Sequence, residues 1–236
     1  MSQSSPIALV FGGSRGIGAA CVRLLAASSW QVAYTYVNRR PDGAVGHGYQ
    51  ADIRDAAAVA AVFDQIEADL GARPNAVVAN AGINVPAGPM AQFKPDDFRQ
   101  LVEVNIVGAF NILAEAARRV QDGGSIVAVT TSLVRQAVPG TGPYAATKAA
   151  VESMVRSMSK ELAGRGVRVN AVAPGPVDTD LFNAGKTEEA KQRMAGFSPF
   201  NRIGRPEEIA QVVRFLLSDD SSWVAGQVIQ PNGGMV

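Results

Sequence analysis

The sequence predicts a single α/β domain, residues 1–236, in which a parallel sheet is covered by helices on both faces. Short apolar runs alternate with longer stretches of helical periodicity along the whole chain, and strands buried on both faces are expected to be continuous apolar runs of this kind. A glycine-rich turn directly follows the first apolar run and leads into a helical stretch. No linker, repeat or low-complexity block divides the chain, so one doubly wound domain is expected.

The apolar runs give about seven strands and the periodic stretches give five long helices. Several helices begin at an Asp or a Pro, which are residues that often start helices. The strands are predicted at 7–11, 31–36, 48–51, 76–79, 125–130, 168–173 and 228–230. The helices are predicted near 15–28, 56–70, 95–120, 143–164 and 206–217.

The connection between the second and third strands is unusually short. Residues 37–47 contain the run Asn-Arg-Arg-Pro-Asp-Gly and can barely form a helical crossover. We therefore expect a loop there, with the crossover helix shortened or absent. The outer edge of the sheet would then be less covered than the rest.

Composition and charge argue against several classes of function. The chain has 22 basic and 21 acidic side chains, so its charge gives no reason to expect nucleic acid or an anionic membrane as a partner. No apolar stretch approaches the roughly 20 residues needed to cross a bilayer, and the start Met-Ser-Gln-Ser-Ser-Pro does not read as a signal peptide, so a cytoplasmic protein is expected. Cys21 is the only cysteine and is expected in the core, and His47 is the only histidine, so no metal site is expected.

The glycine-rich turn is suited to holding the pyrophosphate of a dinucleotide. Glycines let backbone N–H groups approach the phosphates at a helix amino end, where the helix dipole favours anions. The spacing departs from the regular G-x-G-x-x-G pattern, and an ordinary glycine turn is the alternative. The expected contacts are Gly12, Ser14, Arg15, Gly16, Ile17 and Gly18.

Tyr144 and Lys148 form the second informative pattern. They lie four residues apart in a predicted helix and therefore project from the same face. A phenol is a poor base near neutral pH unless a neighbouring positive charge stabilises its anion, and Lys148 could do this together with a cationic cofactor. A solvated amphipathic pair is the alternative.

With these two patterns in one chain, the sequence resembles the short-chain dehydrogenase/reductase family over its whole length. Further segments match the family pattern in order: Asp52-Ile53, Asn80-Ala81-Gly82, Asn105, Pro174-Gly175 with Thr179, and Asn232-Gly233-Gly234. The tail from Ser218 to Met235 is similar to the 3-oxoacyl-carrier-protein-reductase-like branch. The resemblance implies a Rossmann-type fold and reversible hydride transfer between a nicotinamide cofactor and a carbonyl compound or secondary alcohol.

The same resemblance implies a catalytic set of Asn105, a seryl hydroxyl, Tyr144 and Lys148. In most relatives the hydroxyl lies thirteen residues before the tyrosine, which is Thr131 here, whereas the serine itself is Ser132. We take Ser132 because an unbranched hydroxyl is less restricted at χ1. Asn105 is expected to kink its helix and to hold a water that links Lys148 to solvent. The implied cofactor contacts beyond the glycine turn are Asp52, Ile53, Asn80, Ala81, Gly82, Tyr144, Lys148, Pro174, Gly175, Val177 and Thr179.

The end of the second strand favours NADP(H) over NAD(H), which stays a second possibility. Enzymes that prefer NAD carry an Asp or Glu there, and this chain carries none. Asn38, Arg39 and Arg40 follow the strand instead, and with Arg15 they could bind a 2′-phosphate. The alternative is that these arginines only solvate a surface loop.

Residues 180–205 are expected to form a lid over the substrate, and its apolar side chains favour an apolar-bodied carbonyl compound. A 3-oxoacyl-carrier-protein reductase is an alternative: Arg165 occupies a position matching a carrier-protein docking residue, but the stretch from Gln121 to Gly124 lacks the expected second basic region. A non-catalytic NADP(H)-binding sensor or scaffold is a further alternative. The family resemblance also implies a homotetramer or homodimer, formed through the helices 95–120 and 143–164 and the tail 228–236.

Overall fold

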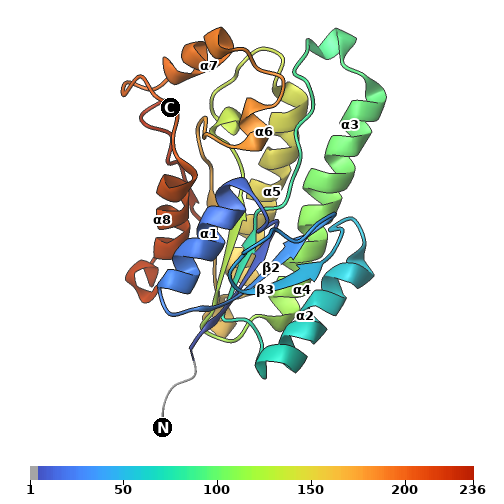
Figure 1. Cartoon of the computed structure of the whole chain (residues 1–236), viewed down its shortest axis with the longest axis vertical. Helices are drawn as coiled ribbons and strands as arrows, with labels where there is room; N and C mark the ends of the chain where they lie inside the picture. Colours follow the sequence, from blue (N-terminus) through green and yellow to red (C-terminus); the bar gives the residue numbers. More distant parts are fainter. Residues whose placement is uncertain (1–4) are drawn as a thin grey trace.

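The computed structural model of the chain describes residues 5–236. The expectation about the amino-terminal start rests mainly on the first four residues, which lie outside this range. A parallel sheet of seven strands in the order β3-β2-β1-β4-β5-β6-β7 forms the centre, with helices on both faces (Figure 1). This confirms the predicted fold class.

The bounds of the elements follow the predicted alternation of strand and helix. The strands are β1 (Ile7–Phe11), β2 (Gln31–Tyr36), β3 (His47–Gln50), β4 (Ala76–Ala79), β5 (Ser125–Val129), β6 (Arg168–Val172) and β7 (Val228–Ile229). The helices are α1 (Gly16–Ala27), α2 (Ala56–Leu70), α3 (Pro95–Val102), α4 (Ala109–Arg119), α5 (Gly142–Glu161), α6 (Asp180–Asn183), α7 (Glu188–Ala195) and α8 (Pro206–Leu217).

Side chains of each strand alternate between two separate cores. Ile7, Leu9 and Phe11 of β1 pack with residues of α2, α4 and α5 on one face of the sheet. Ala8 and Val10 pack with residues of α1 and α8 on the other face. Both sets are buried, which explains why the strand is apolar without interruption.

Most predicted bounds are right to within a residue or two; the largest difference is in α5, which ends at Glu161 rather than at 164. The predicted third strand, 48–51, begins and ends one residue earlier, at His47 and Gln50. The strands β5, β6 and β7 each end one residue before their predicted ends. Pairing partners decide these ends: β7 pairs only through Val228 and Ile229, with Ala171 and Val172 of β6.

The predicted helix 95–120 is divided by a wider turn. Residues Glu103–Gly108 form a π-helix between α3 and α4. Asn105 lies within it and is 1% exposed. Its side chain bonds the backbone amide and carbonyl of Ile83, so this buried asparagine, a residue of low helix propensity, finds partners where the regular helix is interrupted.

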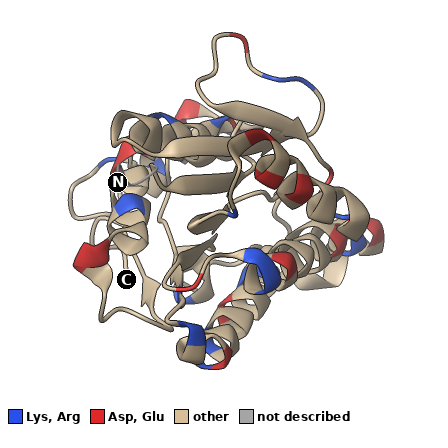
Figure 2. Ribbon diagram, turned by 90° about the horizontal axis from the view of Figure 1, so that it is seen from below, with Lys and Arg blue, Asp and Glu red and all other residues tan. Residues whose placement is uncertain are grey.

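The connection between β2 and β3 contains no helix, as predicted. It projects from the body of the molecule as a loop that carries both basic and acidic residues (Figure 2). Arg40 fixes its base, because its guanidinium donates to the Tyr34 hydroxyl at 3.3 Å and to the carbonyl oxygen of Gly46 at 3.1 Å. Elsewhere Lys and Arg are interspersed with Asp and Glu over the helices (Figure 2).

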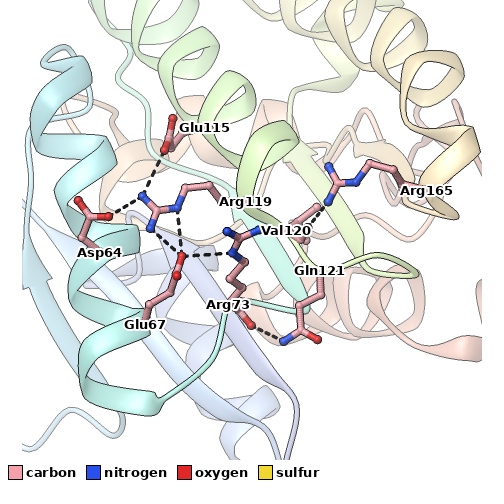
Figure 3. Close-up of polar contacts among 8 residues, drawn as sticks. All are labelled: Asp64, Glu67, Arg73, Glu115, Arg119, Val120, Gln121 and Arg165. Carbon is pink, nitrogen blue, oxygen red and sulfur yellow. Dashed lines mark hydrogen bonds and ion pairs between the residues drawn. The ribbon is translucent and has the colours of Figure 1, made fainter.

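An ion-pair network joins α2 to α4 at the end of the sheet away from the glycine turn (Figure 3). Arg119 lies 2.6 Å from both Asp64 and Glu67 and 3.5 Å from Glu115. Its guanidinium also lies 5.8 Å from the centre of the Phe63 ring. Because Arg119 is mostly buried, these contacts hold the two helices together more effectively than exposed pairs would.

Two short helices in the segment 180–205 were not predicted. Thr179 caps α6 by accepting from the Phe182 amide at 3.1 Å, and Thr187 caps α7 by accepting from the Ala190 amide at 3.3 Å. Across residues 5–236, none of the helices combines the length and apolar character required of a membrane span.

Candidate active site

The glycine turn between β1 and α1 is held by its neighbours on both sides. Gly12 has a φ of +74°, and a Cβ added at Gly18 would lie 2.1 Å from the Gly12 carbonyl oxygen, so neither position accepts a side chain. Asn80 donates to that carbonyl oxygen at 2.9 Å, and Thr35 accepts from the Gly12 amide at 3.0 Å. The turn is thus a fixed cradle of backbone groups beside the amino end of α1.

A cavity of about 780 Å³ lies at the carboxyl ends of the central strands. Tyr144 and Lys148 both line it from α5, which confirms that they share one helix face. The Lys148 ammonium group donates to the carbonyl oxygen of Val129, the last residue of β5, at 3.0 Å. The sheet therefore fixes the position of the lysine, and Ile17 brings the glycine turn to the same cavity.

Burial shifts the pKa of both residues in the protein alone. It raises the pKa of Tyr144 to about 12 and lowers the pKa of Lys148 to about 8. Desolvation disfavours the charged form of each residue, which is why the two pKa values move in opposite directions. The prediction that Lys148 lowers the pKa of Tyr144 together with a bound cationic cofactor stays a prediction.

Asn105 and Lys148 both lie close to Gly82, and Lys148 also lines the cavity. A Cβ added at Gly82 would lie 3.0 Å from Oδ1 of Asn105 and 3.2 Å from Nζ of Lys148. Asn105 accepts from the Ile83 amide and donates to the Ile83 carbonyl oxygen, both at 2.9 Å, and also donates to Thr147. The asparagine thus holds the segment after β4 against α5, and the predicted water link stays a prediction.

Thr131 and Ser132 both line the cavity, but their hydroxyl groups have different partners. The Ser132 hydroxyl donates to the Ala173 carbonyl oxygen at 2.8 Å and accepts from Asn232 at 3.2 Å. The Thr131 hydroxyl accepts from the Leu133 amide at 3.3 Å. Among the hydrogen bonds of residues 5–236, no acceptor takes the Thr131 hydroxyl proton.

Comparison with known proteins decides the family. The family model described as enoyl-(acyl carrier protein) reductase matches residues 12–236. The chain belongs to the short-chain dehydrogenase/reductase family. It is therefore an oxidoreductase, and the cavity with Tyr144 and Lys148 is its candidate active site.

Relatives of this oxidoreductase cover almost its whole length. It is 38% identical to an NADPH-dependent aldehyde reductase-like chloroplastic protein of Arabidopsis thaliana, with 98% of this chain and 94% of the relative aligned. It is 36% identical to the 3-oxoacyl-(acyl-carrier-protein) reductase MabA of Mycobacterium tuberculosis, with 96% and 91% aligned. A Burkholderia cenocepacia short chain dehydrogenase solved in complex with NADP superposes with a TM-score of 0.89 at 31% identity, covering 99% of this chain and 98% of that one.

The predicted catalytic and cofactor residues fall into two groups in the structure. The cavity is lined by Ile17, Asn80, Gly82, Ser132, Tyr144, Lys148, Pro174, Gly175, Val177 and Thr179. Outside its lining lie Gly12, Ser14, Arg15, Gly16, Gly18, Asn38, Arg39, Arg40, Asp52, Ile53, Ala81 and Asn105. The first group surrounds the reacting end of the site, and the second includes the glycine turn and the open end beside β2.

Charged residues at the open end already have protein partners. Arg39 pairs with Asp42 at 2.6 Å on the exposed loop. Arg54 binds both carboxylate oxygens of Asp52, and these hydrogen bonds lower the pKa of Asp52. Asp55 caps α2 by accepting from the amides of Ala57 and Ala58, so Asp52 is not the cap of this helix.

Sequence reasoning missed several residues that line the cavity. The loop residues from Ile83 to Ala87 form one wall, and Met235 reaches the cavity from the chain's end. Lys186 also lines it, from the segment between α6 and α7. Folding brings these residues to the site. None of them lies at a spacing from Tyr144 that a sequence motif defines.

Proposed function

We propose that the enzyme interconverts a carbonyl compound and the corresponding alcohol, which is a secondary alcohol when the carbonyl compound is a ketone, with NADP(H) as the hydride carrier. The observation that carries the proposal is the convergence of Tyr144, Lys148 and the glycine turn on one cavity. The names of the Arabidopsis and Burkholderia proteins, which mention NADPH and NADP, support the cofactor. The bound nicotinamide would supply or accept the hydride, and the protein would hold the substrate and move the proton.

The residues present suit a dinucleotide. The glycine turn offers backbone N–H groups where a side chain at Gly12 or Gly18 would block the approach. Asn80 and Thr179 place polar side chains between this turn and Lys148. We assign the pyrophosphate to the glycine turn and the nicotinamide half to the cavity around Pro174 to Thr179.

Tyr144 would protonate the carbonyl oxygen during reduction and take the proton back during oxidation. A neutral phenol is the correct form for the donor, and burial keeps Tyr144 protonated to about pH 12. Lys148 would stabilise the phenolate that remains, with its ammonium held by Val129. Positioned proton transfer of this kind typically contributes about 10²–10⁴ in rate.

The hydrogen bonds favour Thr131 over Ser132 as the hydroxyl that polarises the substrate oxygen. Ser132 already uses its proton on the Ala173 carbonyl oxygen and is 1% exposed. Thr131 retains its proton for a substrate, and it has the spacing to Tyr144 that most relatives show. We therefore propose Thr131 for this role and a positioning role for Ser132, which ties the loop after β5 to Ala173 and Asn232.

The alternative of 3-oxoacyl-carrier-protein reduction has support from the relative MabA. A carrier protein would need free basic groups to dock. Arg165, which matches a docking position, instead donates to the carbonyl oxygen of Val120 (Figure 3), and also to Asp122 and the carbonyl oxygen of Ala117. Its guanidinium caps the end of α4, so this alternative has less support than reduction of a free small molecule.

A homotetramer and a cytoplasmic location remain part of the proposal. Phe98 of α3 and Phe110 of α4 are 43% and 56% exposed, and Trp223, after α8, is 98% exposed. Large apolar side chains on two separate surfaces suit two interfaces with copies of the same chain.

The decisive experiment measures NADPH oxidation with a panel of aldehydes and ketones for the wild type and Tyr144→Phe. Phenylalanine preserves ring volume and removes the hydroxyl, so turnover should fall by at least about 10²-fold while NADPH binding is retained. Activity of Tyr144→Phe near that of the wild type would contradict the mechanism. Tight NADPH binding by the wild type without turnover of any carbonyl would instead favour a sensor or scaffold.

A further inference from the structure

The charges that line the cavity are all positive. Lys148 and Lys186 are its only charged lining residues, and no Asp or Glu of the described chain lines it. The presence of Lys148 in the cavity is explained by its proposed role beside Tyr144 and by its hydrogen bond to the Val129 carbonyl oxygen. Lys186 has no part in the proton transfer, so its presence in a largely apolar cavity requires a separate explanation.

Lys186 is held at the edge of the cavity by Phe182. Its ammonium nitrogen lies 4.7 Å from the centre of the Phe182 ring and donates to the Phe182 carbonyl oxygen. Phe182 also lines the cavity, so the pair forms part of its wall. An ammonium group has three donors, and the carbonyl oxygen uses one of them.

No carboxylate neutralises this lysine. In the described chain, none of the salt bridges includes Lys186, whereas Lys191 in the adjacent helix α7 pairs with Glu188 at 2.7 Å. Burial, followed by repulsion from Lys191, lowers the pKa of Lys186. Half-burying a cation without an anionic partner costs free energy, and a bound anionic ligand would remove that cost.

We propose that Lys186 forms an oxyanion-binding site in the wall of the cavity, for a group carried by the carbonyl substrate or for the diphosphate of the cofactor. The part of this inference that concerns the substrate rests on the proposed function. If the substrate carries the group, the enzyme prefers carbonyl compounds with a carboxylate at the end remote from the reacting carbon. The enzyme would then select substrates by their charge as well as by the apolar body that the lid segment, residues 180–205, is expected to favour.

The test compares two aldehydes of similar shape, 4-carboxybenzaldehyde and 4-methylbenzaldehyde, with wild type, Lys186→Met and Lys186→Arg. Methionine keeps the apolar stem and removes the charge, and arginine keeps the charge. Lys186→Met should lower kcat/KM for the carboxylate aldehyde by about tenfold or more and change that for the methyl aldehyde less than about twofold. Lys186→Arg should retain most of the preference. Arg193→Met is the matched control, because it removes an exposed charge of α7 in the lid segment, outside the cavity lining, and it should leave the preference unchanged.

A second measurement identifies the source of the oxyanion and does not depend on turnover. Fluorescence titration gives the Kd of NADPH for each variant, and calorimetry with 4-(hydroxymethyl)benzoate and 4-methylbenzyl alcohol gives the affinity for each alcohol. A rise of about tenfold in the NADPH Kd of Lys186→Met, with the aldehyde ratio unchanged, would assign the oxyanion to the cofactor diphosphate. If neither the ligand ratio nor the NADPH Kd changes, Lys186 only caps α6 and the proposal is overturned. Absence of turnover in the wild type would count against the proposed function alone, since both binding measurements would still report on Lys186.

Discussion

Lys148 donates a hydrogen bond of 3.0 Å to the carbonyl oxygen of Val129, across the junction between α5 and the end of β5. The lysine is only 6% exposed, so its charge has little access to water. This bond fixes the ammonium group without neutralising it. The arrangement keeps a positive charge ready beside Tyr144, and it does so at a cost in folding stability that can be measured.

Replacing Lys148 by Met should stabilise the fold in a pH-dependent way while removing activity. The pKa of Lys148 falls from 10.5 to about 8 on folding, so between these values the unfolded chain binds the extra proton and wild-type stability rises with pH. The advantage of Lys148→Met in the free energy of unfolding should therefore shrink by about 2 kcal/mol between pH 7 and pH 9.5. Urea unfolding at both pH values measures it. An advantage that is independent of pH would show that the lysine is not desolvated in the folded protein.

Thr131→Ala and Ser132→Ala should show which of the two hydroxyl groups acts in catalysis and which one stabilises the fold. Thr131→Ala removes the available hydroxyl, so kcat should fall by about 10²-fold or more with little change in melting temperature. Ser132→Ala leaves the Asn232 amide and the Ala173 carbonyl without their partner, and should cost about 1–3 kcal/mol of stability. Thr131→Ser, which keeps a hydroxyl, is the control. The reverse pattern, with kcat lost only in Ser132→Ala, would restore the assignment made from sequence.

The arginines beside β2 should confer a preference for NADPH over NADH of at least about a hundredfold, since two charge-assisted contacts can supply that difference. Arg39→Ala and Arg40→Ala should raise KM for NADPH and leave KM for NADH nearly unchanged. The loss of charge should raise KM for NADPH less in Arg40→Ala than in Arg39→Ala, because Arg40 also anchors the loop through Tyr34. Arg23→Ala, an exposed arginine of α1 paired with Glu207, is the control. Equal efficiency of the wild type with both cofactors would show that the loop arginines face only solvent.

The enzyme should sediment as a homotetramer at micromolar concentration. Phe110→Asp and Trp223→Asp place a charge in each of the two proposed interfaces, and each should reduce the assembly to dimers. Both side chains are exposed in the single chain, so the substitutions should leave the fold intact. Sedimentation of the wild type only as a monomer would contradict the assignment of both surfaces.

Local patterns predicted the sheet, the glycine turn and the helix that carries Tyr144 and Lys148, because each depends on residues close in sequence. The missing crossover helix followed from loop length alone. The hydrogen bonds that distinguish Ser132 from Thr131 could not be predicted, since Asn232 and Ala173 come from distant segments. Lys186 falls within the lid expected at residues 180–205, but only the folded segment between α6 and α7 shows that its side chain lines the cavity.

The π-helix at Glu103–Gly108 gives the chain an unusual tolerance to a change in length. A single wide turn accommodates one residue more than a regular helix needs, and the flanking helices keep their phase. A one-residue deletion within it could therefore restore a regular helix, with Leu101 before it and Ile112 after it still facing the core. Such a deletion would remove or displace Asn105 and so lose its hydrogen bonds to Ile83 and Thr147. The flanking helices therefore depend only on their phase across this turn, whereas the contact with Ile83 depends on one residue, Asn105.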